Sequence, residues 1–351
     1  MTKGLRTALV AFVSVAALAF AGSALAAYTP RLTVSHLPLA LGAGGSTDIT
    51  IALDQSDDAT AKATIYVPQG YSSTLTAAPG AQVGSIDASI LASAISPTQP
   101  LPLKGTIQAD DPAKYAASAT TCTGAPTHDA VWLLRLQAAG TELAVPGYLD
   151  AVTAAAEAPL GKFKLQFCQP SPYIPQSAGG ATFGAKLVSA TLHLASVFTL
   201  PSESGSYGWT VVATPYTVGT AVPNAAGTVQ ARGFVQLPAR VSLKAKVKKR
   251  LATLTGALRV GSAGVAGLRV TLLAGTSRTK LKAAGSATTR ASGAFSFKKT
   301  IRKTTYFRVR VTAAARSTTC TGVVPGIPCA SATLNPFTVQ SAIVKAVPRR
   351  R

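Results

Sequence analysis

Residues 264–272 read GVAGLRVTL, residues 288–297 read TTRASGAFSF, and residues 304–311 read TTYFRVRV. In all three stretches apolar side chains alternate with polar or basic ones. A period of two places one set on each face of a β-strand. The turn residues Ser292 and Gly293 precede the second alternating run, as expected at a tight hairpin. The pattern predicts strands with an apolar inner face and a basic outer face.

The order of these stretches resembles the bacterial Ig-like and carboxypeptidase-regulatory-like (transthyretin-like) modules of exported proteins, over roughly residues 240–315. The positions that match their pattern are Gly256, Gly264, Gly267, Val270, Leu272, Gly293, Phe295, Phe297 and Val309. Ser292 departs from it, because these modules usually carry Asp before the hairpin glycine. The resemblance implies an antiparallel sandwich that serves as an adhesive, spacer or accessory module, and it implies no chemistry.

The charge of the chain is divided unevenly along its length. The 351 residues carry a formal net charge of +22, yet all 12 acidic residues lie between Asp48 and Glu203. Residues 27–237 carry −3, whereas residues 238–351 contain 13 Arg and 10 Lys and no carboxylate side chain. We therefore divide the mature chain into a near-neutral module, 27–237, and a basic module, 238–351.

The near-neutral module is also predicted to be β-rich. Short runs of Val, Ile, Leu and Thr, such as 61–67 and 162–168, are separated by clusters of Pro, Gly, Ser and Asp. Two Ala-rich pieces, Ala88–Ala94 and Leu149–Ala158, are expected as short helices, and Trp132 is expected in the core. The predicted fold class is all-β, with two antiparallel β-sandwich modules after an N-terminal signal peptide. No known family is recognised in the near-neutral module.

Residues 1–26 have the layout of a secretory signal. Lys3 and Arg6 precede an apolar run, and Ala24-Leu25-Ala26 provides a small-residue cleavage motif. An uncleaved membrane anchor is the alternative, but the apolar run is short for a membrane span. We predict a protein that is secreted or associated with the cell envelope, without a transmembrane anchor.

The four cysteines agree with an oxidising compartment. Cys122, Cys168, Cys320 and Cys329 allow three pairings. Pairing of neighbours along the chain, Cys122 with Cys168 and Cys320 with Cys329, is favoured because each bond then closes a short loop. The loop between Cys320 and Cys329 is expected to be a pinned hairpin tip, with a presented binding loop as the alternative.

Few residues point to catalysis or to a metal. His193 is predicted as an outward or hydrogen-bonded strand residue, and the chain lacks a Gly-x-Ser-x-Gly elbow. A secreted hydrolase built on His128, Asp129 and an unassigned Ser is the competing functional class. The acidic run Asp54, Asp57 and Asp58 is interpreted as a solvated turn, with a Ca²⁺ loop as the alternative. We therefore predict no enzyme, no cofactor and no metal site.

The basic module is predicted to bind polyanions. Lys and Arg on strands protect sheet edges and add solubility, but this does not explain the lack of Asp and Glu. The expected contact residues are Lys244, Lys246, Lys248, Lys249, Arg250, Arg302, Lys303, Arg308 and Arg310. The expected partners are an anionic cell-wall polymer, lipid headgroups or polysaccharide. Non-specific nucleic acid is a weaker alternative, because few aromatic residues accompany the cations, and a purely structural spacer is the third class.

Overall fold

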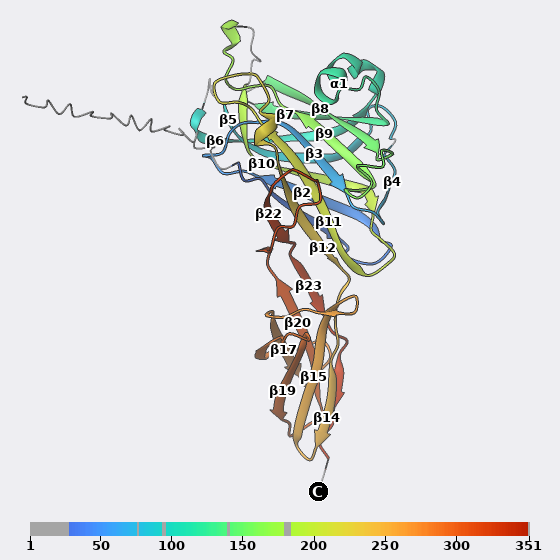
Figure 1. Ribbon diagram of the computed structural model, residues 1–351. Coiled ribbons are helices and arrows are strands. Elements are labelled where there is room, and N and C mark those ends of the chain that lie inside the picture. Colours follow the sequence, from blue (N-terminus) through green and yellow to red (C-terminus); the bar gives the residue numbers. More distant parts are fainter. Residues whose placement is uncertain (1–27, 76, 93–95, 139–140, 179–183, 350–351) are drawn as a thin grey trace, which may run out of the picture.

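The computed structural model describes residues 28–75, 77–92, 96–138, 141–178 and 184–349. The predicted signal peptide, residues 1–26, lies outside the described residues. The described chain is mostly β, with a large mixed sheet and two smaller antiparallel sheets (Figure 1). No helix in these residues is long and apolar enough to cross a membrane.

The large sheet has 14 strands. In spatial order they are β1 (Arg31–Leu37), β2 (Gly44–Ala52), β10 (Ala185–Thr199), β5 (Gln82–Ala92), β6 (Ser96–Asp110), β7 (Ala130–Ala138), β8 (Thr141–Ala151), β9 (Phe163–Cys168), β3 (Thr60–Val67), β11 (Gly205–Pro215), β12 (Val229–Leu237), β22 (Cys329–Leu334) and β21 (Arg316–Ser317), with β4 (Ser72–Ser73) paired to β10. All neighbours are antiparallel except β12 and β22, which are parallel. The expectation of purely antiparallel sheets is therefore wrong for this pair.

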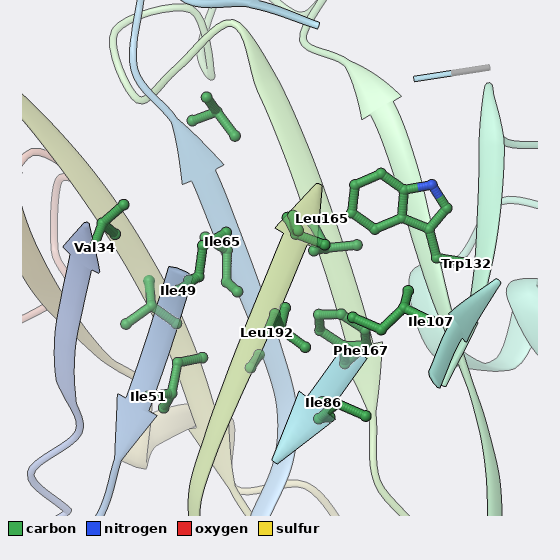
Figure 2. Packing of buried hydrophobic residues seen from close by; sticks show 14 of the residues in the cluster. Val34, Ile49, Ile51, Ile65, Ile86, Ile107, Trp132, Leu165, Phe167 and Leu192 are labelled. Atoms are coloured by element: carbon green, nitrogen blue, oxygen red, sulfur yellow. The ribbon is translucent and has the colours of Figure 1, made fainter. Parts of the chain in front are cut away.

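The large sheet wraps around one apolar core, to which most of its strands contribute side chains (Figure 2). Its first strand packs across β12 at Gly233, where a Cβ atom would lie only 2.8 Å from the Leu32 carbonyl oxygen. Glycine permits this close approach of two backbones. Trp132 and Trp209 are 1% and 0% exposed, so the core position predicted for Trp132 is confirmed.

Helical structure lies elsewhere than predicted. The single α-helix of the described residues is α1 (Ala116–Thr123), preceded by the 3₁₀ turn η1 (Pro112–Tyr115); two further 3₁₀ turns are η2 (Gln176–Ala178) and η3 (Ala225–Gly227). The two helices expected from Ala-rich sequence are wrong: Ala88 to Ala92 belongs to β5, and Leu149 to Ala151 ends β8. Strands are hydrogen-bonded to both sides of β5 at Ala88 and Ala92, and this pairing outweighs the helix propensity of Ala. Residues 152–158, the rest of the second piece, form a loop and turns.

The two small sheets pack face to face around a second core. One contains β13 (Ala239–Val241), β14 (Lys244–Lys248), β15 (Leu251–Val260), β16 (Ala263–Gly264) and β19 (Ala294–Thr300); the other contains β17 (Arg269–Gly275), β18 (Lys282–Thr288), β20 (Thr305–Ala313), β23 (Phe337–Gln340) and β24 (Val344–Ala346). We call these ten strands the small-sheet unit. Residues 316–334, which the sequence places in the basic module, instead contribute β21 and β22 to the large sheet.

Both predicted disulfides are present. Cys122–Cys168 joins the last turn of α1 to the end of β9, and Cys320–Cys329 closes the loop before β22. That loop is docked on β12 by the fully buried side chain of Gln230. The Gln230 amide donates to the carbonyls of Val324 and Ile327, at 3.1 and 2.6 Å, and its oxygen accepts from the amide nitrogen of Val323 at 2.8 Å. The loop is thus a packed structural element.

His36 is buried at the end of β1 among aromatic rings. Its Nδ1 lies 3.0 Å from the Thr47 hydroxyl and its Nε2 lies 3.0 Å from the Tyr71 hydroxyl. Burial disfavours the charged ring and lowers the pKa of His36 to about 4, against a smaller opposing effect of Asp48. The fold therefore holds this imidazole in its neutral form.

We predict that acid destabilises the protein through His36. The unfolded state takes up a proton near pH 6.5 and the folded state only near pH 4, so stability is lost as pH falls between these values. The shift corresponds to roughly 3 kcal/mol of unfolding free energy. Denaturant unfolding from pH 7 to 4 should show this loss in the wild type relative to His36→Gln. Parallel pH profiles for the two proteins would contradict the assignment.

Candidate polyanion-binding surface

The exposed cations of the small-sheet unit follow from the strand alternation. In β14, Ala245 and Val247 pack against the second core, whereas Lys244, Lys246 and Lys248 are exposed. The inward residues are apolar and gain burial, so the alternate positions point to solvent and can carry charge. The side chains of β14 therefore agree with the orientation expected from the sequence.

The outer face of β14, β15 and β19 carries a short basic row. Lys246 is opposite Thr253, and Thr253 is opposite Lys298 on the far side of β15. Lys244 lies one row away, opposite Thr255. Lys298 was not among the predicted contact residues, because only the register between β15 and β19 brings it beside Lys246.

Basic residues from three chain segments meet at the end of the unit farthest from the large sheet (Figure 1). Lys248, Lys249 and Arg250 form the turn between β14 and β15, and the amide of Ile301 donates to the Arg250 carbonyl at 2.8 Å. Arg302 and Lys303 follow directly. We define the basic tip as six exposed residues: Lys248, Lys249, Arg250, Arg302, Lys303 and Arg349.

Arg349 joins the basic tip through the backbone. Its amide nitrogen donates to the Lys249 carbonyl at 3.0 Å, which holds the end of the described chain against the β14–β15 turn. A further exposed arginine, Arg278, has its guanidinium 5.6 Å from the ring centre of Tyr306 at the start of β20. Neither Arg349 nor Arg278 was among the predicted contact residues. The run of arginines at 349–351 was a signal for Arg349, but the position of Arg349 in space depends on the strand pairing.

Arg308 and Arg310 lie on the outer face of the other small sheet. Arg310 is opposite Thr271 of β17 and Gln340 of β23, and the Arg308 guanidinium donates to the Gln340 side chain at 2.9 Å. The nine predicted residues are therefore not on one face. Five meet at the basic tip, Lys244 and Lys246 lie on one face, and Arg308 and Arg310 lie on the opposite one.

The positive field of this unit has no internal counter-charge. Within the described parts of the chain, all residues that form ion pairs belong to the range 48–193, in the large-sheet region. Residues 238–351 contain no Asp or Glu. Like charges at this density repel one another and destabilise the folded unit unless an external anion neutralises them.

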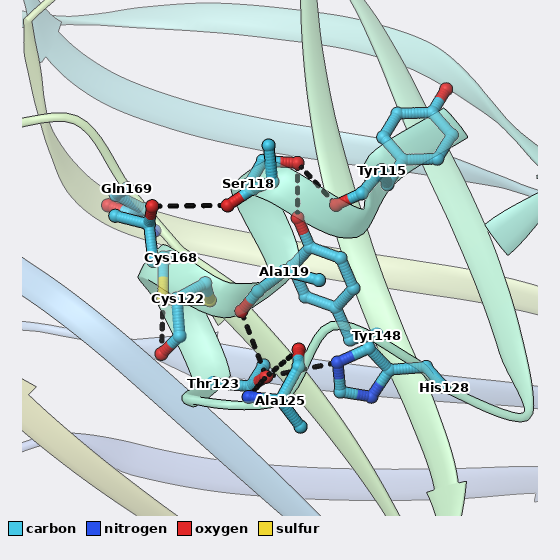
Figure 3. The surroundings of a disulfide bond; sticks show 12 residues. Tyr115, Ser118, Ala119, Cys122, Thr123, Ala125, His128, Tyr148, Cys168 and Gln169 are labelled. Atoms are coloured by element: carbon cyan, nitrogen blue, oxygen red, sulfur yellow. Dashed lines mark hydrogen bonds between the residues drawn. A yellow bond between two sulfur atoms is a disulfide. The ribbon is translucent and has the colours of Figure 1, made fainter. Parts of the chain in front are cut away.

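His128 contacts the Thr123 hydroxyl at the end of α1 (Figure 3), and its other ring nitrogen has a different partner from the one expected. Its Nδ1 lies 2.9 Å from Asp150, whereas Asp129 accepts a hydrogen bond from the Ala151 amide. Its Nε2 lies 3.0 Å from the Thr123 hydroxyl, which also bonds the last turn of α1. The His128 side chain is only 3% exposed, and its contacts link α1 to β8.

The other titratable residues singled out in the sequence are also held by neighbours. His193 is a strand residue whose Nδ1 lies 2.8 Å from Asp48, in agreement with its prediction. Asp57 is 2% exposed and accepts from the amides of Thr29 and Asp54, so a solvated turn is wrong for this residue. The described residues contain no group of three or more His, Cys, Asp or Glu side chains arranged to hold a metal ion.

Comparison with known proteins adds no assignment. No protein-family model and no curated protein matches this chain.

Proposed function

We propose that this is an exported, non-catalytic protein that binds anionic polymers of the cell envelope through the basic tip. The observation that carries the proposal is the meeting of six exposed cations from three chain segments, in a unit without a single carboxylate side chain. Binding a polyanion would relieve the repulsion among these charges. The contact would be electrostatic and would weaken as salt screens it.

We also propose a fold family for the small-sheet unit and an exported location for the protein. The small-sheet unit would be an Ig-like or transthyretin-like sandwich, supported by two small antiparallel sheets around one core. Residues 1–26 would direct export, and the two disulfides agree with an oxidising compartment. The large sheet would project from the surface to which the basic tip is attached.

A second candidate is attachment to anionic lipid headgroups. Leu251 and Val347 are 42% and 50% exposed; Leu251 directly follows Arg250, and Val347 lies two residues before Arg349. Apolar side chains beside cations favour the interface of a membrane with negatively charged lipids. Binding to anionic vesicles but not to soluble polyanions would favour this candidate over the polymer.

The chain from residue 27 onward provides the test, because β22 joins the basic segment to the large sheet. We would measure its retention on immobilised polyphosphate and on polygalacturonate, which carry phosphate and carboxylate groups, between about 0.05 and 1 M NaCl. Retention at low salt should fall steeply as the screening length shortens from about 10 Å at 0.1 M to about 3 Å at 1 M. No retention at low salt would support a purely structural spacer.

A further inference from the structure

Side chains of the large sheet line an apolar cavity of about 100 Å³. Its inner wall includes Ile49, Ile65, Ile86 and Leu192, all of which are buried. Figure 2 shows the side chains of Ile86, Phe167 and Leu192 directed into the same interior space. An interior lined in this way cannot satisfy a charged or hydrogen-bonding group.

One end of the cavity reaches the surface. Leu143, Val145 and Leu187 line it and are only half-buried, although they pack against the main core. Gln169 and Pro170, which directly follow β9, are also part of the lining. Gln169 has the sole polar side chain among the lining residues of this cavity, and it is half-buried. The entrance is therefore apolar, with a single uncharged amide.

We propose that this cavity binds the end of one linear hydrocarbon chain with an uncharged head. The cavity is smaller than the roughly 150 Å³ apolar cavity that is known to bind benzene, so a narrow chain fits better than a ring. Along β5 the lining residues Ile86, Ala88 and Ile90 form a wall of about 14 Å, which suits an extended chain. A hydroxyl or ester head at the entrance can hydrogen-bond to Gln169.

The cavity and the basic tip are separate sites. The cavity lies in the large sheet, and none of its lining residues belongs to the basic tip. An uncharged probe separates the two sites, because a fatty acid or an anionic dye would also be attracted to the cations. We therefore choose 1-decanol as the probe, in buffer with enough salt to suppress electrostatic binding.

The test is calorimetric titration of the chain from residue 27 onward with 1-decanol. Ala88→Leu and Ala190→Leu add methylene groups at cavity-lining positions and should each weaken binding at least tenfold. Ala144→Leu is the matched control, because Ala144 is exposed on the opposite face of β8 and should leave binding unchanged. Absence of saturable binding by the wild type, or equal binding by all the variants, would overturn the proposal.

A direct mapping experiment tests the proposal even if Ala88→Leu and Ala190→Leu do not fold. A decanol derivative with a photoreactive diazirine at its methyl end would be cross-linked to the wild-type chain and the labelled residues identified by mass spectrometry. Labels should fall on β5, β8 and β10 at the cavity-lining positions, and excess unlabelled decanol should remove them. Labels elsewhere on the molecule would contradict the assignment.

Discussion

Replacing Lys248, Lys249, Arg250, Arg302 and Lys303 with Ser should weaken binding to polyphosphate in 0.15 M salt by on the order of 100- to 1,000-fold. Each cation near a strongly anionic surface contributes about 1 kcal/mol, and five such contributions are only partly additive. The substituted side chains are exposed and lie outside the core, so the variant should keep its fold. Competition binding with fluorescent polyphosphate measures the effect.

A charge-matched variant distinguishes the basic tip from net charge alone. Arg240, Arg259, Arg269, Arg290 and Arg316 are five exposed arginines away from the basic tip. Their replacement with Ser removes the same charge, but we expect no more than a several-fold loss of affinity. If both variants weaken binding equally, the distributed positive charge of residues 238–351, and not the basic tip, is responsible.

The second large effect concerns the attachment of the disulfide loop to the large sheet. Gln230→Met retains the size of the side chain but removes its four hydrogen bonds to the backbone of residues 323–327. At about 1 kcal/mol for each bond, we expect a loss of about 4 kcal/mol in unfolding free energy. Denaturant unfolding measures the loss, and the amides of Val323 and Val324 should exchange faster with solvent.

Gln236→Met on the same strand is the control. The Gln236 side chain is half-buried, but unlike that of Gln230 it does not hold a loop in place. We expect less than 1 kcal/mol of change. A loss for Gln230→Met as small as that of the control would mean that the loop is not docked, and would restore the alternative of a presented binding loop.

Local patterns in the sequence were sufficient for most strands and for the direction of many side chains. The alternation in residues 244–248 predicted which side chains face the core, because that information is carried by neighbours two positions apart. The two disulfides were predictable from short spacings. By contrast, residues 88–92 and 149–151 are strands because their neighbours in the sheet supply the hydrogen bonds.

The candidate site was predicted in part for the same reason. Its residue types and outward direction were visible in the sequence, but the tip is created by backbone contacts such as Ile301 with Arg250 and Arg349 with Lys249. These contacts bring together residues 51 and 100 positions apart, as did the unexpected pairing of His128 with Asp150. No local pattern reports such register, so the sequence alone did not show which of the nine predicted residues share a surface.

The most direct test of the central claim is a residue-level footprint of the bound polyanion. Lysine amines would be acetylated in the free chain and in its complex with polyphosphate, and the modification of each lysine would be quantified by mass spectrometry. Lys248, Lys249 and Lys303 should be protected several-fold more than Lys62, Lys104 and Lys186 of the large sheet, which serve as internal references. Equal protection of all lysines, or none at the basic tip, would contradict the account.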